Sequence, residues 1–312
     1  MYDTIIIGGG PAGLSAGIYA ARGNLNTLIL EPGLAGGQMV NTLHVSNYPG
    51  VLPEDTGMAL GQRMGEQAES FGAKIEYLEA LEIQDHGDKK IVVTDDGNLE
   101  TKTVIIATGA KPRPLGAKGE AEFAGKGVSY CATCDGTFYQ DGDVFIIGGG
   151  DSAVEEALYM ARIARKIYIV HRRDELRAEA KYAERAMNHE KIEILWNTEL
   201  REIKGEKFAS SVVLENNKTG EITEIKAEDK VPFGIFLYVG NTPQTQFLGD
   251  LLELNKGYIP VDGNQQTSVP GIFAAGDIVD KRVRQVVNAA SEGAMAALAS
   301  ERYIGDLDAK KK

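Results

Sequence analysis

The chain has 312 residues, a length typical of two domains. Its 33 Lys and Arg against 45 Asp and Glu give a formal net charge of −12, which argues against nucleic acid or an anionic membrane surface as a partner. Hydrophobic residues make up 43% and charged residues 25%, so a disordered or fibrous chain is excluded.

The apolar stretches, the N-terminal residues and the number of cysteines indicate the cellular compartment in which the protein is expected. No apolar stretch reaches the roughly 18 residues that cross a bilayer. A β-like run, Thr4–Ile7, begins almost at Met1 and leaves no room for a signal peptide. Secreted domains rely on several disulfides, whereas this chain has two cysteines, so we expect a cytoplasmic protein.

The first predicted elements are a strand, a glycine-rich turn, a helix and a second strand. Strand Thr4–Ile7 leads into G-x-G-x-x-G, formed by Gly8, Gly10 and Gly13, and strand Thr27–Leu30 follows the helix. This order is the context that a dinucleotide fingerprint requires. The first glycine turns tightly, the second admits backbone N–H groups to a pyrophosphate, and the third lets helix and strand pack. The helix N-terminus adds partial positive charge under the phosphates.

An acid ends the second strand. Glu31 follows Gly13 by 18 residues, where a carboxylate commonly accepts hydrogen bonds from an adenosine ribose. Because a carboxylate would repel a 2′-phosphate, this first site suits FAD or NAD. A helix from about Thr56 to Phe71 and the strands Ile91–Thr94 and Val104–Ala107 follow a glycine-containing loop.

The segment Lys111–Pro114 is predicted to be stiff and extended, because proline restricts its own backbone and that of the preceding residue. We interpret it as a crossing between domains. Beyond it, Cys131 and Cys134 form C-x-x-C, followed by Asp135. A structural disulfide closing so short a loop would contribute under roughly 2 kcal/mol. Zinc needs four ligands, and none of the four histidines has metal-site spacing to the pair.

The redox interpretation of this pair is favoured, while the structural and metal interpretations stay open. A redox dithiol needs two sulfurs close in sequence, an accessible thiolate and a nearby proton donor, a role that Asp135 can fill. The pair precedes a second copy of the nucleotide motif, offset by 140 residues from the first. In that copy Gly148, Gly150 and Ala153 occupy the three fingerprint positions, and strand Lys166–Val170 follows its helix. Two copies in register favour nucleotide binding over turns that serve packing alone.

The second copy ends in basic residues instead of an acid. His171, Arg172 and Arg173 end its second strand, and Arg177 follows one turn later. Guanidinium groups pair with phosphate in a bidentate manner, so this site suits NADP(H). The alternative interpretation of these residues is a solvated charged surface.

The remaining elements return to the first domain. A hairpin is predicted from Ser211–Leu214 and Ile222–Lys226, and the chain crosses back near Gly240–Pro243. An apolar strand ending in an acid, Gly271–Asp277, precedes a helix over Val286–Tyr303. This tail is too short to stand alone. We therefore predict an α/β fold of two Rossmann-like three-layer (ββα) nucleotide-binding domains, the second inserted into the first.

The predicted boundaries are 1–112 and 243–312 for an FAD-binding domain, and 113–242 for an NADPH-binding domain that carries the dithiol. Together these sites describe electrons moving from nicotinamide to flavin to disulfide. The dithiol and the nicotinamide site share the inserted domain. Either they approach opposite flavin faces or that domain swivels, and two short linkers favour the swivel.

These motifs resemble those of the low-molecular-weight, bacterial-type thioredoxin reductases. The resemblance spans nearly the whole chain: GGGPAG at 8–13, GGQ at 36–38, ATG at 107–109, CATCDG at 131–136, GGGDSA at 148–153, HRRDELR at 171–177, GIFAAGD at 271–277 and RQ at 284–285. It implies a homodimer that uses FAD and NADPH to reduce thioredoxin. One departure is Val283, where an aromatic residue often precedes the Arg-Gln pair.

The resemblance also implies roles for individual residues. Cys134 would face the flavin, Cys131 would attack the thioredoxin disulfide and Asp135 would be the acid–base group; no metal is expected. The implied FAD contacts are Gly8, Gly10, Pro11, Ala12, Gly13, Glu31, Gly36, Gly37, Gln38, Asn47, Thr108, Gly109, Gly276, Asp277 (to the ribityl chain), Arg284, Gln285 and Val286. The implied NADPH contacts are Gly148, Gly150, Asp151, Ser152, Ala153, His171, Arg172, Arg173 and Arg177.

Other functions remain to be weighed. A disulfide reductase or dithiol oxidase of the same fold, acting on another protein or a small molecule, would share every nucleotide motif. A ferredoxin–NADP reductase needs no dithiol, so the cysteine pair argues against it. A ferredoxin-linked thioredoxin reductase should lack the NADPH site, so Arg172, Arg173 and Arg177 argue against that. A nucleotide sensor without catalysis would leave the dithiol without a purpose.

Overall fold

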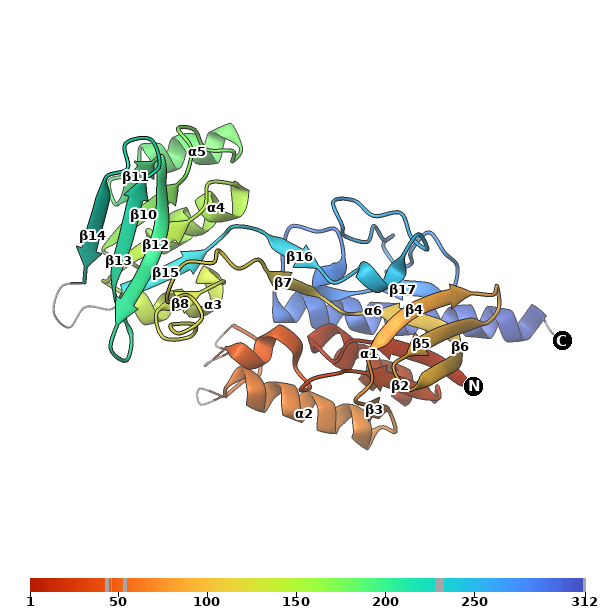
Figure 1. Cartoon of the computed structure of the whole chain (residues 1–312). Coiled ribbons are helices and arrows are strands. Elements are labelled where there is room, and N and C mark those ends of the chain that lie inside the picture. The colour runs from red at the N-terminus through yellow and green to blue at the C-terminus, as the bar shows by residue number, and fades with distance from the viewer. Residues whose placement is uncertain (43–44, 46, 53–54, 228–232, 311–312) are drawn as a thin grey trace. The chain divides into compact units, whose positions relative to one another are not determined.

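The computed structural model describes residues 1–42, 45, 47–52, 55–227 and 233–310, and the chain folds as two compact units (Figure 1). The first unit combines 1–111 with 241–312, and the second is 112–240. Each unit is built on a sheet with a parallel centre, which confirms the predicted α/β fold class. No helix in the described part of the chain is long and apolar enough to span a membrane.

A mixed sheet forms the centre of the first unit. Its strands are β1 (Tyr2–Ile7), β2 (Thr27–Leu30), β3 (Lys74–Glu76), β4 (Ala80–Asp85), β5 (Lys90–Thr94), β6 (Gly97–Ile106) and β17 (Ile272–Ala274). The order is β3-β2-β1-β6-β5-β4, with β17 also paired to β6. Strands β3, β2, β1, β6 and β17 run parallel, whereas β5 pairs antiparallel with β6 and β4 pairs antiparallel with β5. The tail strand β17 thus completes the sheet that the N-terminal strand begins.

Alternate residues of these strands point to opposite faces of the sheet. Ile6, Ile29 and Ile105 pack with the helices, whereas Ile5 and Ile7 pack with a second core on the other side. The helices are α1 (Pro11–Arg22), α2 (Gly57–Ser70) and α6 (Val286–Lys310), and the 3₁₀ turns are η1 (Gly37–Asn41), η3 (Gln246–Leu248) and η4 (Gly276–Ile278). The η1 turn occupies the start of the predicted loop.

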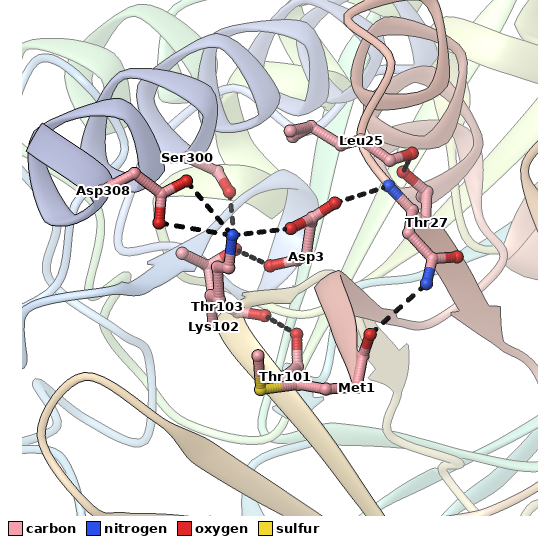
Figure 2. A network of polar contacts seen from close by, with 10 residues as sticks. Met1, Asp3, Leu25, Thr27, Thr101, Lys102, Thr103, Ser300 and Asp308 are labelled. Carbon is pink, nitrogen blue, oxygen red and sulfur yellow. Dashed lines mark hydrogen bonds and ion pairs between the residues drawn. The ribbon is translucent and has the colours of Figure 1, made fainter. Parts of the chain in front are cut away.

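Helix α6 runs seven residues beyond the predicted end at Tyr303. Ile304 and Leu307 continue its buried face, which explains why the helix does not stop there. Near its C-terminus, Lys102 Nζ forms ion pairs with Asp3 Oδ1 at 3.0 Å and Asp308 Oδ2 at 3.3 Å. Figure 2 shows this lysine between the two carboxylates, which joins β6, β1 and the end of α6.

The second unit has three layers. A parallel sheet of β8 (Val128–Ser129), β9 (Asp143–Ile147), β10 (Lys166–His171), β11 (Ile192–Trp196) and β15 (Phe233–Leu237) runs in the order β11-β10-β9-β15-β8. On one face lie α4 (Asp151–Met160) and α5 (Ala180–Met187). The other face packs against the antiparallel strands β12 (Thr198–Gly205), β13 (Ala209–Asn216) and β14 (Ile222–Lys226). The predicted hairpin is therefore confirmed as β13–β14.

Two short strands mark the places where the chain passes between the units. They are β7 (Ala110–Pro112) and β16 (Asn241–Pro243), and they pair with each other. Gln244 N donates to Gly109 O at 3.0 Å, and Arg113 N donates to Gly240 O at 2.8 Å, so backbone bonds continue on both sides of the pair. The extended conformation predicted for this proline-rich segment fits its role as a short strand.

Candidate functional site

The first glycine loop has no room for side chains. A Cβ at Gly8 would lie 2.4 Å from Ala107 O, and one at Gly13 would lie 1.8 Å from Gly8 O. Gly8 also has a φ of +109°, a conformation that favours glycine. The missing Cβ atoms therefore let the end of β1, the end of β6 and the first turn of α1 approach one another closely.

Helix α1 begins at this loop with its first N–H groups uncapped by any side chain. Such groups form a ready anion-binding site, since the helix dipole also favours negative charge there. Beside them, Glu31 Oε2 accepts a hydrogen bond from Gly9 N at 2.7 Å, and Glu31 Oε1 accepts one from Gly33 N at 2.9 Å. The carboxylate is thus held against the loop, at the end of β2.

Two further segments of the predicted flavin site adjoin this loop. Gly36 N donates to Gly9 O at 2.7 Å, and a Cβ on Gly37 would lie 2.9 Å from the Cα of Gly10. Thr108 follows β6, and its backbone N lies 3.0 Å from the position of a Gly8 Cβ. Gln38 is exposed at the edge of the same turn.

The tail supplies the other side of the site. Two glycines of the tail lie against Ala12 in α1. A Cβ on Gly276 would lie 2.8 Å from the Cβ of Ala12, and a Cβ on Gly293 would lie 2.0 Å from the carbonyl oxygen of Ala12. This contact brings η4 and α6 against the first turn of α1. Asn47 Nδ2 donates to Gln285 Oε1 at 3.0 Å, so another predicted pair meets here.

Two polar groups in this tail are buried without hydrogen bonds among the described residues: Asp277 Oδ1 and Arg284 Nε. Lys281 Nζ lies 3.8 Å from Asp277 Oδ1, and burial raises the pKa of Asp277 despite this cation and Arg284. Buried polar groups normally have partners, so orphaned ones suit a bound polar molecule. A hydroxyl-bearing chain such as the ribityl group of FAD fits this acceptor and donor.

The second glycine loop repeats part of this arrangement. A Cβ on Gly148 would lie 2.6 Å from Tyr238 O, and helix α4 begins after Gly150 without a side-chain cap. Ala153 is buried where the first copy has glycine. Asp151 Oδ1 accepts from Glu179 N at 2.8 Å, and Ser152 is exposed in the first turn of the helix. This loop therefore also leads into a helix N-terminus that no side chain of the described residues caps.

The basic strand end divides into exposed and buried parts. Arg172, Arg173 and Arg177 are exposed, and their guanidinium groups form no ion pair or side-chain hydrogen bond within the described residues. Arg177 N donates to Gly149 O at 2.7 Å, which holds this segment beside the glycine loop. Unpaired guanidinium groups beside a helix N-terminus suit a phosphate.

His171 differs from the arginines. Its side chain is 3% exposed, its Nε2 lies 2.9 Å from Glu175 O, and burial lowers its pKa. A Cβ on Gly149 would be 2.4 Å from the ring, so the imidazole packs directly against the glycine loop. His171 therefore packs against the glycine loop, next in sequence to Arg172 and Arg173, and its position suits a structural role.

The two cysteines form a disulfide with an S–S distance of 2.08 Å, in and before the short helix α3 (Ala132–Asp135). Ser129 Oγ donates to Asp135 Oδ2 at 2.6 Å. Burial raises the pKa of Asp135, while this hydrogen bond lowers it. Burial and the nearby Asp135 raise the pKa of Tyr139 to about 12. The disulfide therefore lies beside a carboxyl group that can carry a proton.

Three further residues at the disulfide turn were not predicted from the sequence: Thr133, Glu156 and Tyr238. Tyr238 OH accepts a hydrogen bond from Ala132 N at 2.7 Å, and Thr133 Oγ1 donates to Glu156 Oε1 at 3.0 Å. Tyr238 also approaches Gly148 through its carbonyl oxygen, so it joins the disulfide turn to the second glycine loop. Glu156 lies in α4, where a carboxylate ordinarily faces solvent, so its sequence position carried no signal.

In the first unit the glycine loop and the first turn of α1 thus adjoin Glu31, Gly36, Gly37, Thr108 and Gly276. In the second unit the glycine loop adjoins His171 and Arg177. Within the described residues, no group of three or more His, Cys, Asp and Glu side chains is arranged to hold a metal ion. A disulfide beside a partly buried acid can accept two electrons and two protons. The glycine loops supply the features of nucleotide sites: close backbone approach, and helix N-termini that no side chain caps within the described residues.

Comparisons with known proteins agree with this chemistry. The family described as pyridine nucleotide-disulphide oxidoreductase matches residues 2–293. The thioredoxin reductase of Peptoclostridium litorale is 50% identical over 99% of both chains, and that of Bacillus subtilis (strain 168) is 43% identical over 98% of this chain and 96% of its own. The crystal structure of thioredoxin reductase from Streptococcus pyogenes is similar, with a TM-score of 0.92 and 45% identity over 98% of this chain and 99% of that one.

Proposed function

The chain belongs to the pyridine nucleotide-disulphide oxidoreductase family, and we propose that it is an FAD-containing thioredoxin reductase that uses NADPH. Electrons pass from NADPH to FAD, then to the Cys131–Cys134 disulfide and finally to oxidised thioredoxin. The observation that carries this proposal is the disulfide, with a partly buried acid beside it. It lies in the same unit as a glycine loop followed by exposed arginines whose guanidinium groups have no partner among the described residues.

The proposed FAD-binding domain is the first unit, 1–111 with 241–312. Its glycine loop would receive the pyrophosphate at the N-terminus of α1, and Glu31 would accept from the adenosine ribose. Asp277 and Arg284 would bind polar groups of the flavin chain with atoms that lack hydrogen bonds within the described residues. The further proposed contacts are those named from the motifs: Pro11, Ala12, Gly36, Gly37, Gln38, Asn47, Thr108, Gly109, Gly276, Gln285 and Val286. Bound FAD supplies a carrier that takes two electrons from nicotinamide and passes them to a disulfide.

The proposed NADPH-binding domain is the second unit, 112–240. Its loop from Gly148 to Ala153 would hold the pyrophosphate at the N-terminus of α4. Arg172, Arg173 and Arg177 would bind the 2′-phosphate, which NADH lacks. The burial of His171 favours a supporting role for it in this site, beneath those arginines.

In the proposed reaction, Cys134 receives the electrons and Cys131 attacks the disulfide of thioredoxin. Reducing the Cys131–Cys134 bond takes two electrons and two protons and yields two thiols. Burial raises the pKa of Asp135, so this carboxyl group holds its proton to a higher pH than an exposed aspartate does. Asp135 can therefore supply a proton to the dithiol and take one back.

We further propose that the chain forms a homodimer in the cytoplasm. Val287, Met295 and Leu298 are exposed at spacings of 8 and 3 residues on α6, which places their large apolar side chains on one helix face. A second copy would bury them. Sedimentation equilibrium of the chain and of a Met295→Glu/Leu298→Glu variant tests this: the variant should be lighter by half. Cell fractionation tests the compartment.

Anaerobic titration tests the proposed function as a whole. The purified chain, reconstituted with FAD, should lose its flavin absorbance on addition of NADPH and regain it when oxidised thioredoxin follows. Cys131→Ser should leave flavin bleaching intact and abolish thioredoxin reduction. Bleaching by NADPH with no response to thioredoxin, but reoxidation by a different disulfide, would instead favour a reductase acting on another substrate. A chain that binds no FAD would refute the proposal.

A further inference from the structure

A partly buried carboxyl group, that of Glu156, is hydrogen-bonded to the disulfide turn and has no part in the reaction as proposed above. Glu156 in α4 accepts a hydrogen bond from Thr133 Oγ1 on its Oε1, at 3.0 Å. Its other oxygen, Oε2, is buried and has no hydrogen-bond partner within the described residues. The same Thr133 Oγ1 lies 4.0 Å from Cys131 Sγ. One hydroxyl group therefore stands between the sulfur and the carboxylate.

The hydroxyl group has the chemistry needed to connect the two. It donates one hydrogen and keeps two lone pairs, which can accept. In the disulfide state its hydrogen points to Glu156, so a lone pair is free for a proton carried by Cys131 after reduction. Asp135 accepts instead from Ser129 Oγ, which itself accepts a hydrogen bond from Cys131 N at 3.1 Å. Asp135 is thus linked to the backbone of Cys131 through Ser129, whereas Glu156 is linked toward the Cys131 sulfur through Thr133.

We propose that Glu156 is a positioning residue that exchanges a proton with Cys131 through the Thr133 hydroxyl group. The proposal rests on the proposed function for its source of electrons. When two electrons from NADPH break the S–S bond, the Cys131 sulfur leaves as a thiolate. For this step the Thr133 hydroxyl group turns, so that its hydrogen faces that sulfur and its lone pair faces the protonated carboxyl group of Glu156. It then gives its proton to the sulfur and receives the Glu156 proton on Oγ1.

The same path runs backward when Cys131 attacks a substrate disulfide. The thiol proton passes to Thr133 Oγ1 and the hydroxyl proton passes to Glu156. The sulfur forms a new S–S bond, and one sulfur of the substrate leaves as a thiolate. No electrons move in the proton exchange itself, and the negative charge changes places between Glu156 and Cys131.

The surroundings keep Glu156 able to carry that proton. Burial raises its pKa, and Glu155 on the same helix adds to this, while the bond from Thr133 lowers it. Tyr238, after β15, has its pKa raised well above its usual value by burial, so it stays neutral. Asp135 in α3 and Glu120, which accepts a hydrogen bond from Tyr130 OH at 2.9 Å, are further acids near the disulfide turn. Glu156 is the carboxyl group whose hydrogen-bond partner, the Thr133 hydroxyl group, lies 4.0 Å from Cys131 Sγ.

Alkylation of a single cysteine tests the coupling. In the full chain carrying Cys134→Ser, the rate of reaction of Cys131 with iodoacetamide is followed against pH. An ionised Glu156 disfavours the thiolate, since like charges close together disfavour ionisation. Glu156→Gln should therefore lower the midpoint of the curve of Cys131 alkylation rate against pH by about one pH unit. Glu156→Asp keeps the charge and should restore the midpoint in part.

Glu155→Gln is the matched control, since it removes the same charge one residue earlier in α4. Its shift should be less than half that of Glu156→Gln. A midpoint that moves by less than about 0.2 units in Glu156→Gln, or moves equally in both variants, would overturn the proposal. This assay needs neither NADPH nor thioredoxin. An inactive chain would refute the proposed function and leave this test decisive.

The hydroxyl path has its own readout in turnover with thioredoxin. Thr133→Val removes the path while keeping the size of the side chain, and turnover should fall about tenfold at neutral pH, because positioned proton transfer contributes at least that much. Thr133→Ser keeps the hydroxyl group and should recover most of the loss. Equal turnover in the valine and serine variants would overturn the role of Thr133.

Discussion

Ser129 Oγ donates a hydrogen bond of 2.6 Å to Asp135 Oδ2, across the turn that holds the disulfide. The hydrogen bond favours the charged carboxylate and lowers the pKa of Asp135, while burial of the group raises it. The net direction is upward, so burial is the larger effect. The proton affinity of this acid is therefore a balance that one substitution can shift.

Ser129→Ala should raise the pKa of Asp135 further. Losing a hydrogen bond to the charged form, worth about 1 kcal/mol, corresponds to a rise of about 0.7 units. In the profile of turnover against pH, the limb due to Asp135 is the one that disappears in Asp135→Asn. In Ser129→Ala this limb should move to higher pH by about 0.7 units. Ser211→Ala is the matched control, since Ser211 is equally buried in the same unit and donates to Glu224 at 2.7 Å. A limb that stays in place in Ser129→Ala would contradict this account.

The Arg172→Ala/Arg173→Ala variant should discriminate between the two nicotinamide nucleotides. Each charge-assisted phosphate contact is worth about 1.5–3 kcal/mol, so the KM for NADPH should rise by at least about tenfold. The KM for NADH should change little, because NADH carries no 2′-phosphate. Initial rates with both nucleotides provide the measurement, and Arg185→Ala, an exposed arginine on α5, provides the control. Equal losses with NADPH and NADH would mean that these arginines serve the structure alone.

Much of this architecture could be predicted because its signals are local. The strand Thr27–Leu30 and the hairpin strand Ile222–Lys226 have the predicted limits, and α2 begins directly after Thr56, which caps it by accepting from Ala59 N at 3.1 Å. A run of apolar residues, a proline or a capping residue decides such limits within a few positions. The end of α6 was placed too early, since Ile304 and Leu307 are buried by contacts distant in sequence.

The partners of the disulfide turn could not be predicted for the same physical reason. Tyr238 is hydrogen-bonded to Ala132, which is 106 residues away in the sequence. Glu156 is hydrogen-bonded to Thr133, which is 23 residues away. Neither belongs to a motif, and a glutamate in the middle of a helix ordinarily faces water. The folded unit covers part of each side chain and brings both to the turn, which sequence spacing alone does not indicate.

Gly13→Ala tests whether the first glycine loop tolerates any side chain. Its Cβ would lie 1.8 Å from Gly8 O, a backbone atom, so α1 would have to move away from β1. We expect a loss of stability of about 1–3 kcal/mol and weakened FAD binding. Urea unfolding followed by circular dichroism, with flavin retention after gel filtration, gives both readouts. Gly263→Ala has no atom within 4 Å of the new Cβ and should be nearly neutral. Full FAD retention by Gly13→Ala would contradict the close packing described here.

Lys102→Met tests the ion pairs that join the N-terminal strand to the end of α6 (Figure 2). Hydrogen bonds that Lys102 donates to Asp3, and then to Asp308, raise its pKa above its usual value of 10.5, whereas desolvation lowers it. A lysine whose folded pKa is raised contributes stability below the unfolded pKa and loses it as the pH rises through the folded value. Because all three side chains are partly exposed, the contribution at pH 7 should be about 1 kcal/mol or less. Urea midpoints of the two proteins should therefore differ at pH 7 and converge as the pH rises through the raised pKa of Lys102. Lys89→Met, which breaks a single more exposed pair with Glu100, should show a smaller difference, and a gap that persists at high pH would mean that Lys102 acts through packing of its stem.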